Sequence, residues 1–293
     1  MNDELPRPRV PGPGSIMDLV MPMRAGVDGP ALFCAHTLMG LSWYYLALLP
    51  HVGARYPLYG LQARGLRRPE PLPASIEEMA RDYADQIRMV QRAGPYHLLG
   101  WSLGGNMAFA IAEELERRGE QVGLLVILDT NLLDLDSIET EPWVIYNLVL
   151  AQFGYVPALT PADADPEGRM LEVVRRQPGR GLAEWPEQRL RALQRVIKNN
   201  VAVARAHRPG RVHCSLLFFS ATRNEPTLAE KLQGWRRFVD GPIEAVELDC
   251  DHLEMLLPGP IARLGPALSD RLARAAADSA AGASAAGRCR QSR

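Results

Sequence analysis

The sequence has no apolar run of about 18 residues, the length that a membrane-spanning helix requires. Residues 1–15 are polar and rich in proline, and they lack the apolar stretch of a secretory signal peptide. The formal net charge is only −1 at pH 7, so the chain has no excess of positive charge with which to bind nucleic acid. These absences predict a cytoplasmic protein that binds neither membranes nor nucleic acids.

Cysteine is scarce, with 4 residues in the whole chain. No two cysteines are spaced like metal ligands or like a CxxC redox pair, so the sequence predicts no metal site. Cys34, Cys214 and Cys250 lie in or beside apolar runs and are expected to be buried thiols. Free buried thiols suit a reducing compartment.

Hydrophobic residues make up 47% of the chain, which is enough for a large core. Short runs that are apolar throughout alternate with segments of helical periodicity. The candidate strands are residues 31–36, 57–63, 96–100, 123–129, 213–221 and 245–252, and the clearest candidate helices are residues 75–91 and 103–119. This alternation is typical of α/β proteins with a mostly parallel sheet that helices cover on both faces.

The chain is expected to form one principal domain over residues 16–275. Within it, residues 134–210 mix helical patterns with turns rich in proline and aspartate, so we expect a helical insertion between two strands in the position of a lid. Residues 1–15 are expected to be a flexible leader. Residues 276–293 are biased toward Ala, Ser, Gly and Arg and are expected to be a disordered tail.

One short pattern indicates chemistry. Residues 100–104 read Gly-Trp-Ser-Leu-Gly, a G-x-S-x-G pattern that follows a candidate strand and opens a candidate helix. That context is typical of the nucleophile elbow of α/β-hydrolases, a sharp turn that presents the serine at its tip. Side chains two positions before and after the serine would clash, which explains the glycines. We therefore predict an α/β-hydrolase fold with Ser102 as the nucleophile; the alternative is a Gly-Ser turn without chemistry.

In α/β-hydrolases the acid and then the histidine follow the serine along the chain. Asp129 ends the strand after the elbow helix, and His252 follows the last candidate strand, so both are expected at the same edge of the sheet as Ser102. We predict Asp129 as the acid and His252 as the base. Asp249 and Asp251 flank His252 and are the alternative acids. Without a catalytic role, Asp129 would cap a turn and His252 would be an ordinary core or surface histidine.

The oxyanion hole of such enzymes uses two backbone N–H groups. One belongs to the residue after the nucleophile, Leu103. The other is expected from the loop after the first strand, at about Leu38. Met39, Trp43 and Trp101 lie beside this loop or the elbow and are predicted to line the acyl pocket.

Several stretches together resemble the thioesterase domain that ends nonribosomal peptide synthetase and polyketide synthase lines. They read LFCAHTLMGLSWYYLALLPHV, PLYGLQARGL, GPYHLLGWSLGG, GEQVGLLVILDT and CDHLEML. The resemblance implies that Ser102 accepts a small acyl or peptidyl substrate from the phosphopantetheine thioester of a carrier-protein domain. It implies that His252 acts as general base and acid and that Asp129 orients it. We expect no cofactor of the chain's own, and a monomer.

The sequence departs from the family pattern in the first loop, which usually reads like HPAGG and here reads HTLMG at residues 36–40. The bulkier Thr37 and Met39 affect the width of the pocket and the position of the Leu38 N–H. Trp101 stands where free-standing editing thioesterases commonly have histidine, which favours the chain-terminating type. The editing type, a general carboxylesterase and a non-catalytic α/β-hydrolase scaffold are the alternatives.

Overall fold

The computed structural model of the chain describes residues 19–26, 29–130, 140–156, 158–178, 181–223 and 227–291. The leader predicted at residues 1–15 lies outside the described residues. Among the described residues, no helix combines the length and the apolar character needed to cross a bilayer.

A seven-stranded sheet forms the centre of the molecule, with the strand order β1-β3-β2-β4-β5-β6-β7. Strand β1 pairs antiparallel with β3, and all the other neighbours pair parallel. The strands are β1 (Val20–Arg24), β2 (Leu32–Ala35), β3 (Leu58–Leu61), β4 (Tyr96–Trp101), β5 (Val122–Leu128), β6 (Leu216–Ala221) and β7 (Ile243–Leu248). This confirms the predicted mostly parallel sheet.

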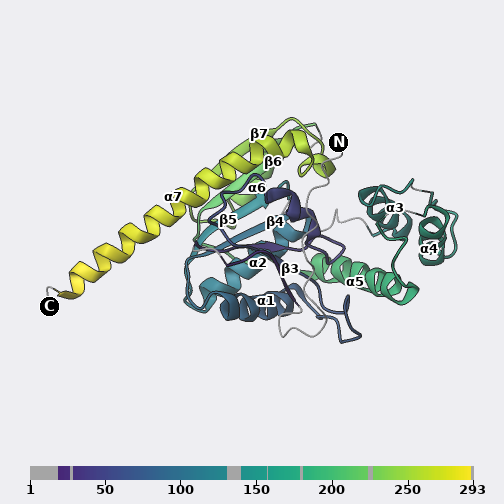
Figure 1. Cartoon of the computed structure of the whole chain (residues 1–293), viewed down its shortest axis with the longest axis horizontal. Helices are drawn as coiled ribbons and strands as arrows, with labels where there is room; N and C mark the ends of the chain where they lie inside the picture. Colours follow the sequence, from purple (N-terminus) through teal and green to yellow (C-terminus); the bar gives the residue numbers. More distant parts are fainter. Residues whose placement is uncertain are drawn as a thin grey trace.

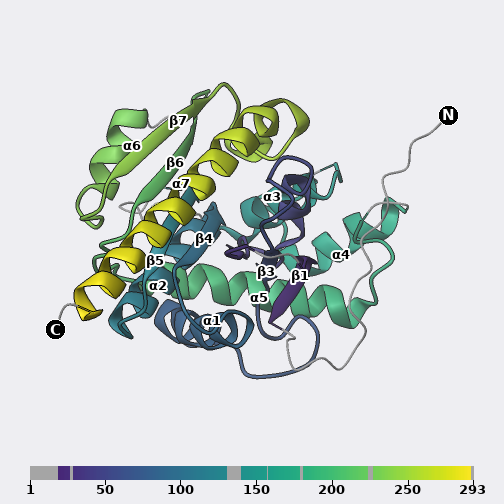
Figure 2. The same ribbon diagram turned by 60° about the vertical axis from the view of Figure 1, so that its left-hand side comes forward.

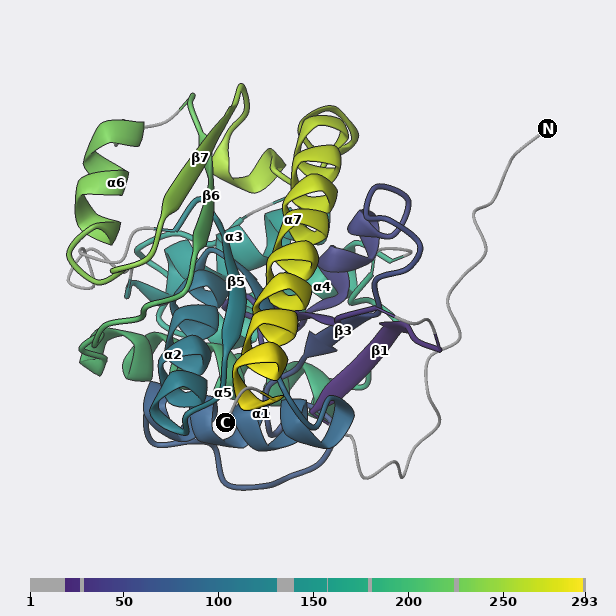
Figure 3. The same cartoon turned by 90° about the vertical axis from the view of Figure 1, so that its left-hand side faces the viewer.

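Helices cover both faces of the sheet, as its apolar strands require. The α-helices are α1 (Ile76–Val90), α2 (Leu103–Arg117), α3 (Pro142–Gln152), α4 (Pro166–Arg176), α5 (Glu187–Ala206), α6 (Leu228–Trp235) and α7 (Pro258–Gln291); η1 (Trp43–Leu48) and η3 (His252–Glu254) are short 3-10 helices. Figure 3 views the molecule from the side of α7, which runs in front of the strands.

Alternation along β5 shows how the two cores form. Leu125 and Ile127 belong to the hydrophobic cluster that α1, α2 and α6 build on one face. Leu124, Val126 and Leu128 belong to the cluster that η1 and α7 build on the other face. Successive side chains of a strand point to opposite faces, so a strand that is apolar throughout contributes to both cores.

Helices α3, α4 and α5 lie between β5 and β6 in the chain, within the predicted insertion. In Figure 1, α3 and α4 stand to one side of the sheet and α5 leads back toward it. These helices share a third hydrophobic cluster with Met39 and Leu41 of the loop after β2. The insertion therefore packs directly against the loop that is expected to supply an oxyanion donor.

The three cysteines near apolar runs and the C-terminal segment were both assigned a state from the sequence. Cys34, Cys214 and Cys250 are buried and form no disulfide, as predicted. The tail expected to be disordered from residue 276 instead continues helix α7 to Gln291 (Figure 2). The physical reason is that alanine, which dominates this segment, has the highest helix propensity, and the helix has already formed where Leu264, Leu268 and Leu272 pack on the sheet.

Candidate active site

Ser102 occupies a strained turn between β4 and α2. Its backbone has φ of +57° and ψ of −130°, a combination that costs an L-residue free energy. A Cβ at Gly100 would overlap the carbonyl oxygen of Gly104, and a Cβ at Gly105 would overlap the side chain of Thr130. A Cβ at Gly104 would lie 2.7 Å from the Ala35 carbonyl oxygen. The three glycines therefore permit the close approach that the turn requires.

Asp129 and His252 meet although 123 residues separate them. Asp129 directly follows β5, and His252 begins η3 after β7. The His252 Nδ1 and the Asp129 Oδ2 lie 2.9 Å apart in a hydrogen bond. Parallel strands bring their carboxyl ends to one edge of the sheet, so β4, β5 and β7 place Ser102, Asp129 and His252 at the same edge.

Asp129 is a buried carboxylate that accepts several hydrogen bonds. Its side chain is only 8% exposed. Besides the bond from His252, its Oδ1 accepts hydrogen bonds from the Ala221 N–H at 3.1 Å and from the Lys231 ammonium at 2.6 Å. Burial acts to raise the pKa of Asp129, but the bonds from His252 and Lys231 outweigh burial and hold that pKa below its ordinary value. Asp129 is thus a stable anion beside the imidazole.

Lys231 is the member of this group that sequence reasoning missed. Its side chain is 5% exposed, and its ammonium donates hydrogen bonds to Asp129, to the Ser220 hydroxyl at 3.1 Å and to the Ala221 carbonyl at 3.0 Å. One signal was available in the sequence. Lys198 and Lys231 are the lysines of a chain whose 33 basic residues are otherwise arginines, and Lys231 lies on the helix that follows β6.

Replacing Lys231 by methionine is expected to lower the free energy of unfolding at neutral pH by about 3–5 kcal/mol, because the buried Asp129 carboxylate loses its ion pair with the Lys231 ammonium. The depressed pKa of Asp129 contributes stability that is present above its unfolded-state pKa and is lost as the pH falls toward its folded-state pKa. The variant raises the folded-state pKa. The interval between the two pKa values is then narrower, so urea unfolding between pH 7 and pH 3 should show a smaller loss of stability on acidification in the variant than in the wild type.

The alternative acids serve the loop around His252 instead. Asp249 is largely exposed and pairs with Arg223. Asp251 caps η3 in a reciprocal arrangement with Glu254. Neither makes a hydrogen bond with the His252 ring, which leaves Asp129 as the partner that the structure brings to it.

Trp101 connects the turn at Ser102 to the short helix η3, which begins at His252. Its indole N–H donates to the His252 carbonyl oxygen at 3.2 Å, and the two rings lie 5.7 Å apart. Its backbone N–H donates to the Tyr45 hydroxyl at 2.9 Å, which in turn donates to the Ala35 carbonyl oxygen at 2.8 Å. Although Ser102 and His252 share this scaffold, the described side chains of the two make no hydrogen bond with each other.

The loop after β2 forms a tight turn in which the Gly40 N–H donates to the Thr37 carbonyl oxygen at 2.9 Å. Gly40 has φ of +74°, which glycine adopts freely. Leu38 lies inside this turn, and its carbonyl oxygen accepts a hydrogen bond of 2.8 Å from the Asn200 side chain of α5. Leu103 begins α2 directly after Ser102. Both predicted oxyanion donors therefore lie on backbone that other elements hold in place.

His36 lies on the same loop but is not available as a base. It is fully buried, and its Nδ1 lies 2.8 Å from the Thr37 carbonyl oxygen. Burial lowers the pKa of His36 to about 4, against an opposing effect of that backbone bond. A buried neutral imidazole of this kind stabilises the loop.

Comparison with known proteins shows what the chain is similar to. The Thioesterase domain family matches residues 30–141. The dimodular nonribosomal peptide synthase of Bacillus subtilis (strain 168) is 38% identical over 264 residues, which cover 88% of this chain and 11% of that protein. Enterobactin synthase component F of Escherichia coli (strain K12) is 28% identical over 263 residues, 88% of this chain and 18% of that protein.

Residues 30–141 thus match the Thioesterase domain family, inside a longer region that is similar to a peptide synthase.

Solved structures agree on the fold of this chain. The Vlm2 thioesterase domain with a bound dodecadepsipeptide superposes with a TM-score of 0.68 at 22% identity and covers 87% of this chain and 98% of that one. The comparisons confirm the predicted resemblance, the α/β-hydrolase fold and the assignment as an enzyme. The chain spans about a tenth to a fifth of the length of the two synthetases, which are much larger proteins.

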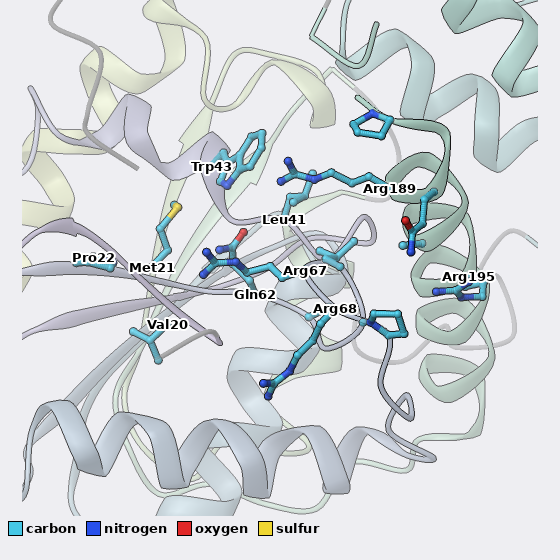
Figure 4. Close-up of a pocket in the computed structure, with 17 residues that line it drawn as sticks. Val20, Met21, Pro22, Leu41, Trp43, Gln62, Arg67, Arg68, Arg189 and Arg195 are labelled. Carbon is cyan, nitrogen blue, oxygen red and sulfur yellow. The ribbon is translucent and has the colours of Figure 1, made fainter. Parts of the chain in front are cut away.

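A cavity of about 560 Å³ opens at the β1–β3 side of the molecule (Figure 4). Trp43, one of the three residues predicted to line the acyl pocket, lines this cavity. Met39 and Trp101 do not line it; they are 1% and 2% exposed and belong to hydrophobic clusters. The assignment of the three residues to the acyl pocket stays a prediction.

The residues described contain no group of three or more His, Cys, Asp or Glu side chains that could hold a metal ion.

Proposed function

We propose that this thioesterase releases an acyl or peptidyl chain from the phosphopantetheine thioester of a carrier-protein domain through an acyl-enzyme on Ser102. The observation that carries the proposal is the hydrogen bond between Asp129 and His252 at the edge of the sheet where the strained turn presents Ser102. The relatives named as peptide synthases support the thioester substrate and the carrier partner.

The proposed first half-reaction is acylation. His252 Nε2 accepts the proton of the Ser102 hydroxyl as its Oγ attacks the thioester carbonyl carbon. The carbonyl oxygen becomes an oxyanion and accepts hydrogen bonds from the backbone N–H groups of Leu103 and Leu38. Collapse of the tetrahedral intermediate breaks the carbon–sulfur bond, and the thiolate leaves with the proton that His252 held. Asp129 remains ionised throughout and stabilises the imidazolium.

The second half-reaction is deacylation. Water, or an amine or hydroxyl of the chain itself, gives its proton to His252 and attacks the Ser102 ester; collapse then returns the proton to the Ser102 Oγ. Water gives a free acid, and an internal nucleophile gives a ring. The helices α3 to α5 stand in the position of a lid and would set the access of water to the ester.

Intact-mass spectrometry tests the proposal. The protein is mixed with a panel of acyl- and aminoacyl-pantetheine thioesters, and the released products are identified. A covalent acyl adduct followed by free acid or cyclic product supports thioesterase activity and distinguishes hydrolysis from cyclisation. No adduct with any thioester, together with fast cleavage of simple oxygen esters, would indicate a general carboxylesterase instead. A protein inert to both and to a serine-directed phosphonate would be a scaffold.

Asn200 is expected to position the loop after β2 that contains Leu38, because its buried side-chain amide donates a hydrogen bond to the Leu38 carbonyl oxygen. Asn200→Ala should lower kcat about three- to tenfold, the equivalent of one hydrogen bond, while KM changes little. Asn199→Ala is the matched control, because the neighbouring Asn199 donates to the Pro73 carbonyl at 3.0 Å and not to this loop. Equal effects in the two variants would show that Asn200 acts only through the stability of α5.

A further inference from the structure

The cavity of about 560 Å³ lies beside the loop that follows β2, which is expected to supply an oxyanion donor. Leu41 and Trp43 line it, and both follow the Leu38 turn by a few residues. Tyr44, next to Trp43, packs edge-on against Trp101 with 5.9 Å between ring centres. The opposite wall comes from the loop after β3 and from the first turns of α5. Ser102, Asp129 and His252 do not line the cavity, and these contacts link its wall to the elbow through Tyr44 and Trp101.

The charge of the cavity is one-sided. Arg67, Arg68, Arg189 and Arg195 line it (Figure 4), and the described lining residues include no aspartate or glutamate, although Arg68 pairs with Glu70 outside the lining at 3.6 Å. Apolar side chains such as Val20, Met21 and Leu66 form other parts of the wall. Cations that converge on a mixed apolar cavity favour an anionic occupant, because guanidinium groups bind carboxylates and phosphates in two-pronged hydrogen bonds.

Arg189 shows that this arrangement is held in place. Its guanidinium lies 4.1 Å from the ring centre of Trp185 and 5.9 Å from that of Trp43, and these two rings pack edge-on at 5.7 Å. Among the described residues, no carboxylate forms an ion pair with Arg189 or Arg195. Burial and the neighbouring Arg67 lower the pKa of Arg189, so a like charge lies close to a partly desolvated cation.

The start of α5 adds to the same field. Pro186 caps this helix without a side-chain hydrogen bond to its first N–H groups, and Pro186, Gln188 and Arg189 all line the cavity. The N-terminus of a helix carries partial positive charge, and an arginine in its first turn is unfavourable unless an anion lies nearby. Glu187, in the same turn, pairs with Arg175 and Arg191 and does not line the cavity.

We infer that this cavity binds an oxyanion carried by the thioester substrate, either a carboxylate of the acyl chain or the phosphate of the pantetheine arm. The apolar walls accommodate the chain that leads to the anion, and Arg189 and Arg195 pair with it. The inference rests on the proposed thioesterase function for the identity of the ligand.

Binding of unreactive analogues tests the inference without turnover. In each analogue an amide nitrogen replaces the thioester sulfur. One arm compares an acyl-pantetheine amide whose chain ends in a carboxylate with its counterpart ending in a primary amide. The other arm compares a neutral acyl chain on phosphopantetheine with the same chain on dephosphorylated pantetheine. Calorimetric Kd values are measured for the wild type, for Arg189→Gln/Arg195→Gln and for the control Arg191→Gln, which lies on the same helix outside the cavity.

The wild type is expected to bind the anionic member of at least one pair about tenfold more tightly or better. That preference should fall to near unity in Arg189→Gln/Arg195→Gln and persist in Arg191→Gln. The arm of the experiment in which the wild type prefers the anionic analogue identifies the source of the oxyanion. No preference in either arm, or a preference that survives in the double variant, would overturn the inference. Cleavage of a neutral acyl-pantetheine thioester, measured in parallel, reports on the proposed function separately.

Discussion

Ser102→Ala is expected to lower kcat by roughly 10⁶-fold and to abolish the covalent adduct, as removal of the nucleophile does in other serine hydrolases. The loss should be as complete in Ser102→Gly. Both variants keep the elbow glycines and the Asp129–His252 hydrogen bond, so their far-ultraviolet circular dichroism should match that of the wild type. Residual turnover within tenfold of the wild type would show that another residue attacks the thioester.

The two Ser102 variants should nevertheless differ in stability. With φ of +57° and ψ of −130°, residue 102 lies where an L-side chain costs about 1–3 kcal/mol. Glycine avoids that cost but loses about 0.5–1 kcal/mol through the greater freedom of its unfolded chain. Ser102→Gly should therefore unfold with a free energy roughly 1 kcal/mol above that of Ser102→Ala. Urea denaturation measures the difference, and a less stable glycine variant would refute the strain.

The sequence was most informative where one local pattern required one geometry. The spacing of glycines around Ser102 predicted the turn, and the alternation of apolar runs with helices predicted the parallel sheet. The meeting of Asp129 with His252 also followed, because the ends of parallel strands share one edge whatever the loops between them do. These are consequences of chain direction and sterics that the order of residues alone contains.

Other features depend on packing between distant segments. Lys231 reaches Asp129 only because α6 packs beside β6, and no local pattern marks that contact. Trp101 and Met39 are buried in hydrophobic clusters that distant segments complete, and no local pattern shows which segments those are. Arg189 lies far along the chain from Trp43, and the cavity between them exists only once α5 has folded back against the loop after β2.

Asp129→Asn is expected to lower kcat by about 10⁴-fold, because a neutral amide no longer fixes the His252 tautomer or stabilises the imidazolium. The backbone should tolerate the change, since residue 129 has φ of +48° and asparagine adopts such angles more readily than most residues. Asp249→Asn is the control, because the exposed Asp249 carboxylate pairs with Arg223 and not with His252. This substitution should leave kcat within about twofold of the wild type, the range of ordinary surface changes. Near-wild-type activity of Asp129→Asn would make Asp249 or Asp251 the acid.

The same substitution should also destabilise the protein, and this second effect can be separated from the first. Asp129→Asn leaves the Lys231 ammonium buried without its carboxylate, a change that costs about 3–5 kcal/mol in comparable buried pairs. Asp129→Asn/Lys231→Met removes both charges and should recover most of that free energy of unfolding. It should not recover kcat, because the imidazolium of His252 still lacks an anion. If activity returned together with stability, the loss in Asp129→Asn would have come from misfolding, and Asp129 would serve the fold alone.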